Sequence, residues 1–463
     1  MDLEERLIDQ TLKLGASYVG IMYHEVDSST ITAENGALKS YVTGKMSGLG
    51  VRVIVDDALG IASSTTLNLK TLNQRVRYAV KMAKVAKDRI EHTTLSSVEP
   101  MKASWRSKVV KSPDSMSDKE KLTLTIDANK AAMLDGVKNS ITRLAWLKER
   151  RVFKSSEGAD VTSELTMTGL AQTSVSSLQG NMEYVSDSKS QCAGFEFLSE
   201  IDWCQFSREV SETSLKAVKA RVPKAGVYRV IADPDLIGLI LHEALGHAAE
   251  ADLVTTKESV LDGRLSEKVA SPLVTIIDEG MVEDGYLLPY DDEGVAKGRQ
   301  VVVEEGVLKG FLHSRDTAYK LGVRSTGNAR AQSFGNRPIV RQTNFFMEAG
   351  NQSFEELVED VDDGLYICGR GTRGGEVDVG LGAFTFRAGP SFVIRKGEVG
   401  EMVRGVSISG MILETLKNVD AVGRDVEVRT TIFGGCGKEG QVARVGHGGP
   451  HVRIGRVVVG GGA

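Results

Sequence analysis

Two histidines and a glutamate stand close together at one place in the chain, in the run His242-Glu243-Ala244-Leu245-Gly246-His247, which has the pattern HExxxH. Imidazole nitrogens bind zinc, and a glutamate beside the metal can act as a general base, so these residue types indicate metal-assisted hydrolysis. Burying two imidazoles and a carboxylate in an apolar segment is costly unless they are paired or bind a metal. The alternative interpretation is two unrelated core or surface histidines.

The spacing of this motif is one residue longer than the H-E-x-x-H of zinc peptidases. On a regular helix, five steps of about 100° leave His242 and His247 roughly 140° apart, too far round to share one ion. We therefore expect an i→i+5 irregularity near Gly246, where the absence of a side chain relieves crowding. Asp233-Pro234-Asp235 predicts the start of this helix, with a capping Asp followed by Pro at the first helical position.

A catalytic zinc site usually has three protein ligands and a water, so the motif lacks one ligand. Cys436 is the candidate, because the glycine-rich run 433–440 places a thiol in a loop that can approach a metal closely. Lys438 nearby would favour its thiolate form. The alternative is a free cysteine in a turn. Other side chains compete for the role of third ligand, namely Glu250, Asp252, His313, His447 and His451.

Length and composition limit the kinds of protein this can be. A chain of 463 residues can form two or three domains with sizeable cores. Its 57 Lys and Arg against 62 Asp and Glu give a net charge of −5 without a basic block, which argues against nucleic acid as a partner.

The start of the chain does not look like a signal peptide, and no apolar run reaches the length of a membrane span, so we expect a soluble cytoplasmic protein without a membrane partner. The four cysteines are too few and too scattered to staple a fold of this size, and we expect them to be reduced.

Residues 1–221 are predicted to form an α+β domain with a mainly antiparallel sheet. Amphipathic periodicity predicts a helix from Leu3 to about Gly15, and Asn35-Gly36 is typical of a tight turn between strands. Further elements are expected as helices at 67–89, 117–134 and 208–221, and as strands at 18–23, 30–31, 38–43, 50–55, 58–63 and 141–175, with an irregular connection at 91–113. His24 and His92 have no partner at suitable spacing, so we expect surface or satisfied positions for both.

Residues 222–463 form the second predicted domain, which follows a short linker at 222–226. Apart from the motif helix, this part reads as a succession of short strands, and it holds most of the 50 glycines. Sequence that is rich in glycine and in strands suggests a closed or sandwich-like β structure wrapped around the motif helix. The predicted fold class is therefore α+β, with a β-rich C-terminal domain that carries the HExxxH helix.

Several motifs together resemble the TldD/PmbA (modulator of DNA gyrase) family of metallopeptidases, specifically its TldD branch. They are the runs at 242–252, 291–294, 306–313, 325–330 and 436–441. The resemblance covers nearly the whole chain. It implies zinc (Zn²⁺) held by His242, His247 and Cys436, with Glu243 as the catalytic base. It also implies a homodimer, or a heterodimer with a PmbA/TldE-type sister subunit that lacks the metal motif.

The function expected from this resemblance is zinc-dependent hydrolysis of unfolded or short peptides. One alternative is a non-catalytic assembly or binding protein, in which a closed four-coordinate zinc site holds the β-rich domain together. Another is a module in which the glycine-rich loop at 369–375 surrounds a phosphate or flavin, although this loop lacks the strand–turn–helix setting of a phosphate cradle. A chelator separates the peptidase from a structural site, because only the structural site should lose its fold with the metal.

Overall fold

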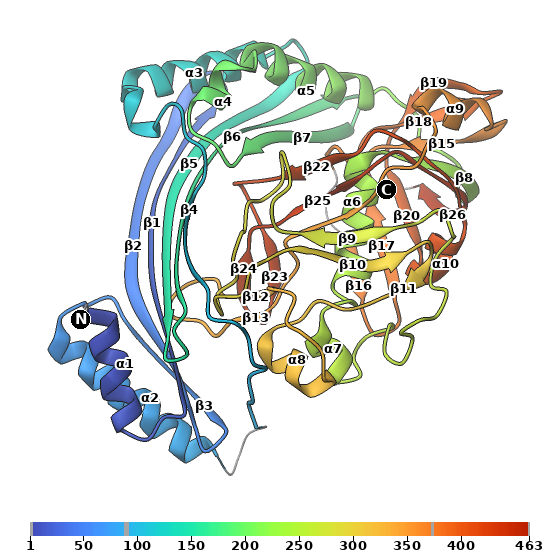
Figure 1. Ribbon diagram of the computed structural model, residues 1–463. Coiled ribbons are helices and arrows are strands. Elements are labelled where there is room, and N and C mark those ends of the chain that lie inside the picture. Colours follow the sequence, from blue (N-terminus) through green and yellow to red (C-terminus); the bar gives the residue numbers. More distant parts are fainter. Residues whose placement is uncertain (1–2, 88–91, 372–374, 462–463) are drawn as a thin grey trace.

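The computed structural model describes residues 3–87, 92–371 and 375–461. It has an α+β fold, as predicted from the sequence. A long, curved and mainly antiparallel sheet with helices at both ends occupies one side of the molecule (Figure 1). The other side holds two further large sheets and the motif helix (Figure 1). We retain 1–221 and 222–463 as a proposed division into domains.

The long sheet has seven strands, in the order β3-β2-β1-β5-β6-β4 with β7 paired to β6. Their bounds are β1 (Tyr18–Glu34), β2 (Ala37–Val55), β3 (Ala58–Ser64), β4 (Lys102–Arg106), β5 (Val137–Ser155), β6 (Asp160–Leu178) and β7 (Asn181–Gln191). The strands predicted at 18–23 and 30–31 form one strand of 17 residues. The polar residues between them lack a strand signal, yet they pair with β2 on one side and β5 on the other.

Helices cover the two ends of this sheet, and each end has its own hydrophobic core. The helices are α1 (Leu3–Lys13), α2 (Leu69–Ala86), the 3₁₀ turn η1 (Pro113–Ser115), α3 (Asp118–Ala131), α4 (Glu196–Ser199) and α5 (Trp203–Ala217). The predicted capping box of α3 is present between Ser117 and Glu120. The helix predicted at 208–221 begins earlier because Asp202 caps it. The end predicted for α2, at 88–89, lies outside the described residues.

Two strands of this sheet, β4 and β7, were not predicted. The segment 91–113, expected to be an irregular connection, contains β4, which pairs in parallel with β6. Its five residues alternate between exposed and half-buried positions, so the strand carries too little apolar sequence to be recognised alone. Trp105 on this strand lines a cavity of about 360 Å³.

Two sheets of the second half flank the motif helix α6 (Pro234–Ile240) and η2 (Leu241–Gly246). The six-stranded sheet contains β11 (Val307–Leu308), β10 (Arg299–Glu304), β9 (Ile276–Glu279), β14 (Asn344–Met347), β25 (Gly446–Gly449) and β22 (Glu427–Thr430). The nine-stranded sheet contains β16 (Gly375–Asp378), β17 (Ala383–Arg387), β20 (Val406–Met411), β26 (Val452–Gly461), β8 (Gly226–Ala232), β15 (Asp363–Ile367), β18 (Ser391–Arg395), β19 (Glu398–Val403) and β21 (Val419–Val422). Most apolar side chains of α6 and η2 join one large buried core between the sheets.

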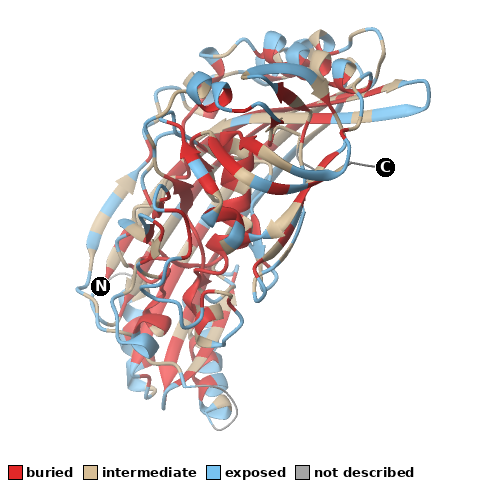
Figure 2. Ribbon diagram, turned by 90° about the vertical axis from the view of Figure 1, so that its right-hand side faces the viewer, coloured by how far each residue is buried: buried red, intermediate tan, exposed pale blue. Residues whose placement is uncertain are grey.

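Short elements complete this half of the chain. They are the hairpins β12 (Ala329–Arg330) with β13 (Ile339–Val340) and β23 (Cys436–Lys438) with β24 (Gln441–Ala443), and the helices α7 (Ala251–Thr255), α8 (Arg315–Leu321), α9 (Phe354–Glu359) and α10 (Ile412–Lys417). In Figure 2 the buried residues run through the interior of both halves, while exposed residues gather on the outer helices and loops. The glycine-rich loop at 369–375, the place of the alternative phosphate or flavin site, lies partly outside the described residues.

The two halves are joined by ion pairs from the long sheet to the 291–294 motif. Arg151 on β5 donates to both carboxylate oxygens of Asp292 at 2.9 Å, and Arg52 on β2 donates to Glu293 at 2.7 Å. Phe334 packs so closely on β2 that a side chain at Gly48 would lie 2.3 Å from its ring. The long sheet is therefore held directly against the part of the chain that carries the metal motif.

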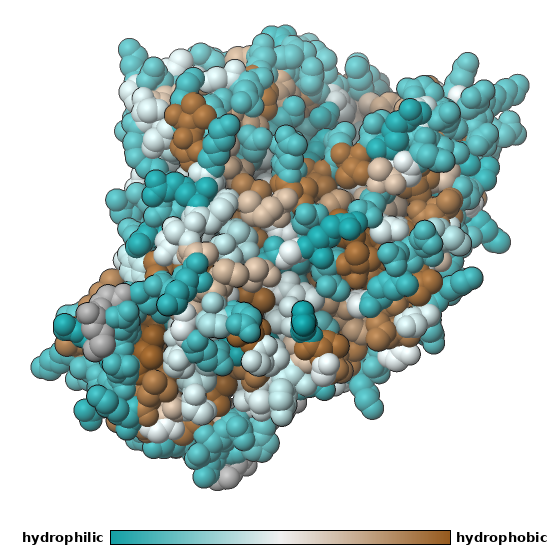
Figure 3. All heavy atoms as spheres, in the orientation of Figure 1, coloured by the Kyte–Doolittle hydropathy of each residue, from teal (hydrophilic) through white to brown (hydrophobic). Residues whose placement is uncertain are grey.

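The surface shows hydrophobic atoms in several separate patches among hydrophilic ones on the face seen in Figure 3. Across the described residues, no helix combines the length and the apolar character needed to cross a membrane.

Candidate metal centre

The helix that carries the two histidines changes its geometry at the motif. Asp233 caps α6 by accepting from the Leu236 N–H at 2.8 Å, and Pro234 occupies the first turn, as predicted. From Leu241 onward the helix is a π-helix, in which the His247 N–H donates to the His242 carbonyl at 3.3 Å. The i→i+5 irregularity expected from the spacing is present. It brings the two imidazole centroids to 5.2 Å from each other.

Gly246 is needed here for a reason that the sequence did not show. A side chain at this position would meet the amide oxygen of Gln342 at 2.1 Å, rather than crowded backbone. Gln342 also donates from its side-chain nitrogen to the His242 carbonyl at 3.0 Å. The absence of a side chain at Gly246 thus leaves space for Gln342, which hydrogen-bonds to the π-turn.

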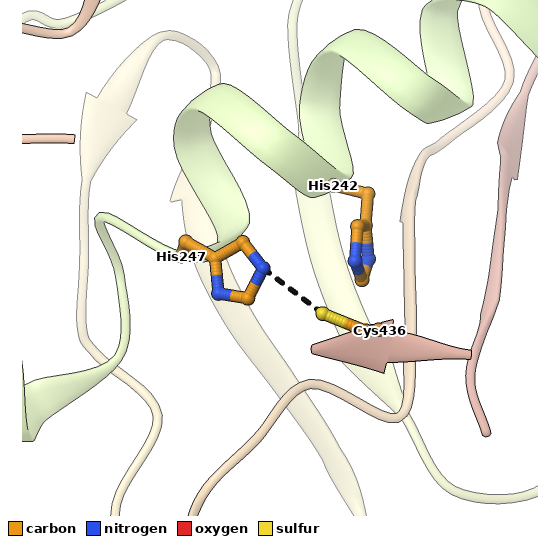
Figure 4. A group of neighbouring side chains, drawn as sticks. All are labelled: His242, His247 and Cys436. Atoms are coloured by element: carbon orange, nitrogen blue, oxygen red, sulfur yellow. Dashed lines mark hydrogen bonds between the residues drawn. The ribbon is translucent and has the colours of Figure 1, made fainter. Parts of the chain in front are cut away.

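Three potential metal ligands meet beside the π-turn. The donor atoms of His242, His247 and Cys436 all lie within 4.8 Å of one another, and all three residues are buried. Cys436 reaches the helix from β23, and its Sγ lies 3.0 Å from Nε2 of His247 (Figure 4). Among the described residues, no other group of three or more His, Cys, Asp or Glu side chains gathers so closely.

Glu243 lies next to this cluster and is open to solvent. Its side chain is 37% exposed, and its Oε2 is 4.0 Å from Nε2 of His247. Burial raises the pKa of the Glu243 carboxyl, and the charge of Glu250 adds to the effect, although His247 opposes it. A carboxylate that is more basic than usual and reachable from solvent is suited to accept a proton.

The carboxylate of Glu250 orients His247. It is fully buried and lies 2.9 Å from Nδ1 of His247, which leaves Nε2 directed at Cys436. Burial lowers the pKa of His247, but Glu250 and the Cys436 contact outweigh it, and the pKa is raised well above its usual value. Such a carboxylate–histidine contact fixes the orientation of a metal-binding imidazole.

Lys438 pairs with two carboxylates beside the cluster. Its ammonium group donates to Glu250 at 2.9 Å, to Asp252 at 2.7 Å and to the Val340 carbonyl at 3.2 Å. It therefore ties the hairpin β23–β24 to the segment that follows the π-helix. The lysine thereby helps to bring Cys436 to the histidines.

The surroundings of His242 lower the pKa of its imidazole. Burial lowers the pKa of His242 well below its usual value, with further lowering by His247, His447 and Arg341. Within the described part of the chain, its Nδ1 has no hydrogen-bond partner. A neutral imidazole with an unsatisfied nitrogen is able to donate a lone pair to a metal.

The other candidates for third ligand lie elsewhere or serve other purposes. Glu250 and Asp252 are engaged with His247 and Lys438, and His447 has its ring centroid 6.2 Å from that of His242 without joining the cluster. His313 contacts Thr317 and His451 contacts Tyr366. His24 is buried against Glu149, and His92 is exposed, so neither joins the cluster.

Arg341 is a further contributor that sequence reasoning missed. It is 1% exposed, and it donates to the carbonyls of Cys436 at 2.6 Å and Gln441 at 3.3 Å. It thereby fixes both strands of the hairpin that carries the thiol. The only signal in the sequence is a charged residue following Ile339-Val340, and a lone arginine in such a place has many possible explanations.

Comparisons with known proteins show the family of the chain. The family model described as the PmbA/TldA metallopeptidase C-terminal domain matches residues 225–461, and the model of domain 1 matches residues 19–83. A metalloprotease from Methanothermobacter thermautotrophicus is 38% identical, covering 100% of this chain and 97% of the relative. The chain belongs to the PmbA/TldD metallopeptidase family.

Two further comparisons with this PmbA/TldD-family chain concern one sequence relative and one solved structure. A zinc metalloprotease TldD homolog from Saccharolobus solfataricus is 28% identical and covers 98% of this chain and 99% of its own length. The crystal structure of TldE from Thermococcus kodakarensis has a TM-score of 0.81 at 21% identity, covering 99% and 100% of the two chains, and shows that the fold is shared. The family and its named relatives identify the chain as a protease of a metal-dependent class.

Proposed function

We propose that this protein is a zinc-dependent peptidase that hydrolyses unfolded or short peptides. The observation that carries the proposal is the convergence of His242, His247 and Cys436, with the carboxylate of Glu243 beside them. We assign the first three as zinc ligands and Glu243 as the catalytic base. The naming of a TldD homolog as a zinc metalloprotease supports the choice of metal.

The donor set fits zinc. Two imidazole nitrogens and one thiolate are ligand types that catalytic zinc uses, and they leave a fourth position for water or substrate. Bond lengths of about 2.0–2.3 Å separate two tetrahedral ligands by roughly 3–4 Å, which is close to the spacing in this cluster. The unsatisfied nitrogen of His242 and the carboxylate behind His247 are also features of a metal-binding pair.

The bound metal would act as a Lewis acid on the scissile carbonyl and would lower the pKa of a bound water towards 7. Glu243 is placed to take a proton from the attacking water and to pass it to the leaving amine. Glu250 holds the His247 ring in one orientation throughout, and Lys438 and Arg341 keep the Cys436 hairpin in place. These residues divide into one that moves a proton and three that maintain geometry.

The setting we propose is a cytoplasmic dimer. The described cysteines are all free, which suits a reducing compartment and leaves Cys436 available as a thiolate. The structural likeness to TldE supports a homodimer or a heterodimer with a TldE-type sister subunit. An active site shaped by two subunits would admit extended peptides and exclude folded proteins.

The test combines metal analysis with product identification. The chain, purified without chelators, should contain about one zinc per site and should cleave members of a mixed peptide library. Chelation should abolish cleavage while the thermal unfolding transition is largely retained, which separates a catalytic from a purely structural zinc. A chain without metal that also gains neither zinc nor activity on addition of Zn²⁺ would contradict the proposal.

A further inference from the structure

The loop between β12 and β13, residues 331–338, connects the long sheet to the hairpin that carries Cys436. At Gln332 and Arg337 the loop is hydrogen-bonded to β24 of that hairpin. At Phe334 the same loop packs on β2 of the long sheet. Figure 1 shows β12 and β13 next to β23 and β24, on the side that faces the long sheet. Two parts of the molecule that are distant in sequence therefore meet through one short segment.

The hairpin itself is too small to hold Cys436 in place. It pairs three residues with three and forms a two-stranded sheet of its own. A side chain added at Gly434 or Gly437 would meet nothing within 4 Å, so these parts of the hairpin are not packed against the protein. An isolated two-stranded hairpin is at best marginally stable in water. Contacts with the rest of the chain must therefore keep the thiol beside the two histidines.

Gln332 and Gln441 make a reciprocal pair of hydrogen bonds between the loop and β24. The backbone N–H of Gln332 donates to Oε1 of Gln441 at 3.0 Å, and Oε1 of Gln332 accepts from the backbone N–H of Val442 at 2.7 Å. Gln441 is 6% exposed, and its side-chain nitrogen donates to the Arg337 carbonyl at 3.0 Å. Both ends of the loop thus hold the strand that pairs with Cys436.

The long sheet supports this loop from the other side. Arg151 on β5 donates to the carbonyls of Ala331 at 3.0 Å and Gln332 at 3.3 Å. On β2, a side chain at Gly50 would collide with the carbonyl oxygen of Phe334, so the loop lies directly on the strand. Because the loop cannot move closer to the sheet, it transmits the position of the sheet to β24.

We propose that Gln332 is a positioning residue for the metal centre, and that the long sheet sets the place of Cys436 through the loop 331–338. The inference rests on the proposed function, since it takes Cys436 as a zinc ligand. A ligand that is already in place need not be ordered when the metal binds. If the hairpin is loosened, Cys436 is correctly placed for only part of the time, and the apparent zinc affinity falls by that fraction.

The first test compares two substitutions of Gln332, which is exposed and therefore tolerates a charge. Gln332→Ala removes the acceptor of the Val442 N–H and should weaken zinc binding by about three- to tenfold, as measured by competition with a chelator. Gln332→Glu keeps an oxygen at that place and should stay within about twofold of the unmodified protein. Gln205→Ala is the control, because this exposed glutamine donates to Glu209 at 2.9 Å in α5, outside the hairpin contacts.

A second substitution acts on the other end of the connection. Phe334→Ala removes the packing of the loop on β2 and should also weaken zinc binding by about three- to tenfold. Phe392→Ala is the control, because this ring is likewise half-buried but stacks on Tyr366 in the nine-stranded sheet. Unchanged zinc affinity in both Gln332→Ala and Phe334→Ala would overturn the inference.

A double substitution separates positioning from general destabilisation. Because Gln332 acts through Cys436, Gln332→Ala should weaken zinc binding no further once Cys436→Ala is present. In the cobalt-substituted protein, absorption from the metal–thiolate bond should be weaker per bound ion in Gln332→Ala than in Gln332→Glu. Full additivity of the two substitutions, or equal absorption, would overturn the inference while the zinc ligands stand. Unchanged zinc affinity in Cys436→Ala alone would instead contradict the proposed ligand set.

Discussion

Two buried histidines with carboxylate partners occur in different halves of this molecule, and they differ in what surrounds them. His24 lies 2.7 Å from Glu149 in the long sheet, and His247 lies 2.9 Å from Glu250 after the π-helix. Burial lowers the pKa of His24, and Arg151 lowers it further, because the guanidinium already supplies the positive charge that Glu149 needs. The pKa of His247 is raised instead, since Glu250 and Cys436 outweigh burial.

The comparison shows that a carboxylate partner alone does not mark a metal-binding histidine. The two histidines differ in the surroundings of the ring nitrogen that does not face the carboxylate. In His247 it faces the thiol of Cys436 at 3.0 Å, whereas Nδ1 of His24 meets no polar partner in the described chain. The pair in the sheet is completed by an arginine and joins the two halves of the molecule. In the pair at the π-helix, Nε2 of His247 remains able to bind a further group such as a metal ion.

The largest expected difference between the regions is in catalysis. Glu243→Gln keeps the size of the side chain but removes the base, so activity should fall by about 10²–10⁴-fold while zinc content stays unchanged. Peptide hydrolysis and metal analysis of the same sample check this. Glu149→Gln, the matched change in the sheet, should leave kcat within a few-fold. Near-normal turnover by Glu243→Gln would show that Glu243 is not the catalytic base.

The next difference is in metal content. Cys436→Ala removes one of the three proposed zinc ligands, so the purified protein should lose most of its zinc and its activity. Cys192→Ala is the control, because this thiol is also buried and donates to the Gly285 carbonyl, and it is not part of the ligand cluster. Metal content should then match that of the unmodified chain. If Cys436→Ala retained both zinc and activity, the third ligand would have to be another residue.

A smaller difference is expected between the substitutions of Glu250 and Glu149, in their effects on zinc affinity and stability. Glu250→Gln disturbs the orientation of His247 and should weaken zinc affinity by about 10–100-fold, as measured by competition with a chelator. Glu149→Gln should leave zinc affinity unchanged and should lower the free energy of unfolding by about 1–3 kcal/mol, because it weakens buried charged hydrogen bonds. The reverse pattern would mean that the two histidine sites have been assigned to the wrong roles.

The smallest expected effect is the pH dependence of stability from His24. Its folded pKa lies below the usual value of about 6.5, so the unfolded chain takes up the proton first as the pH falls. The contribution is favourable above pH ~6.5 and declines below it, by at most about 1.4 kcal/mol per pH unit. Urea unfolding between pH 7.5 and 5 should show a flatter dependence in His24→Gln. An unchanged slope would argue against a neutral His24.

Much of the site could be predicted because its chemistry is visible in short stretches of sequence. The spacing of His242 and His247 required a helix irregularity, and the structure has a π-helix at that place. The α+β fold followed from the order of helical and strand patterns. Cys436 could only be chosen among several candidates, because nothing local shows which distant residue reaches the motif.

What could not be predicted depends on pairing between distant polar residues. Gln342 and Arg341 are buried and hold the π-turn and the Cys436 hairpin, yet each is about 100 residues from its partner in the sequence. The polar middle of β1 is a strand because neighbouring strands satisfy its backbone, which its own side chains do not reveal. The ion pairs of Lys438 could not be predicted for the same reason, since its carboxylate partners come from another segment.

Cys436 follows His247 by 189 residues. On a ribosome adding about 5–20 residues per second, the thiol is synthesised roughly 10–40 s after the histidines. The growing chain therefore holds an incomplete set of the proposed ligands for most of its time on the ribosome, while unfolded segments, including its own, are close at hand. Because Cys436 is made near the end of synthesis, the proposed peptide hydrolysis begins only after most of the chain has been made and the β23–β24 hairpin has docked.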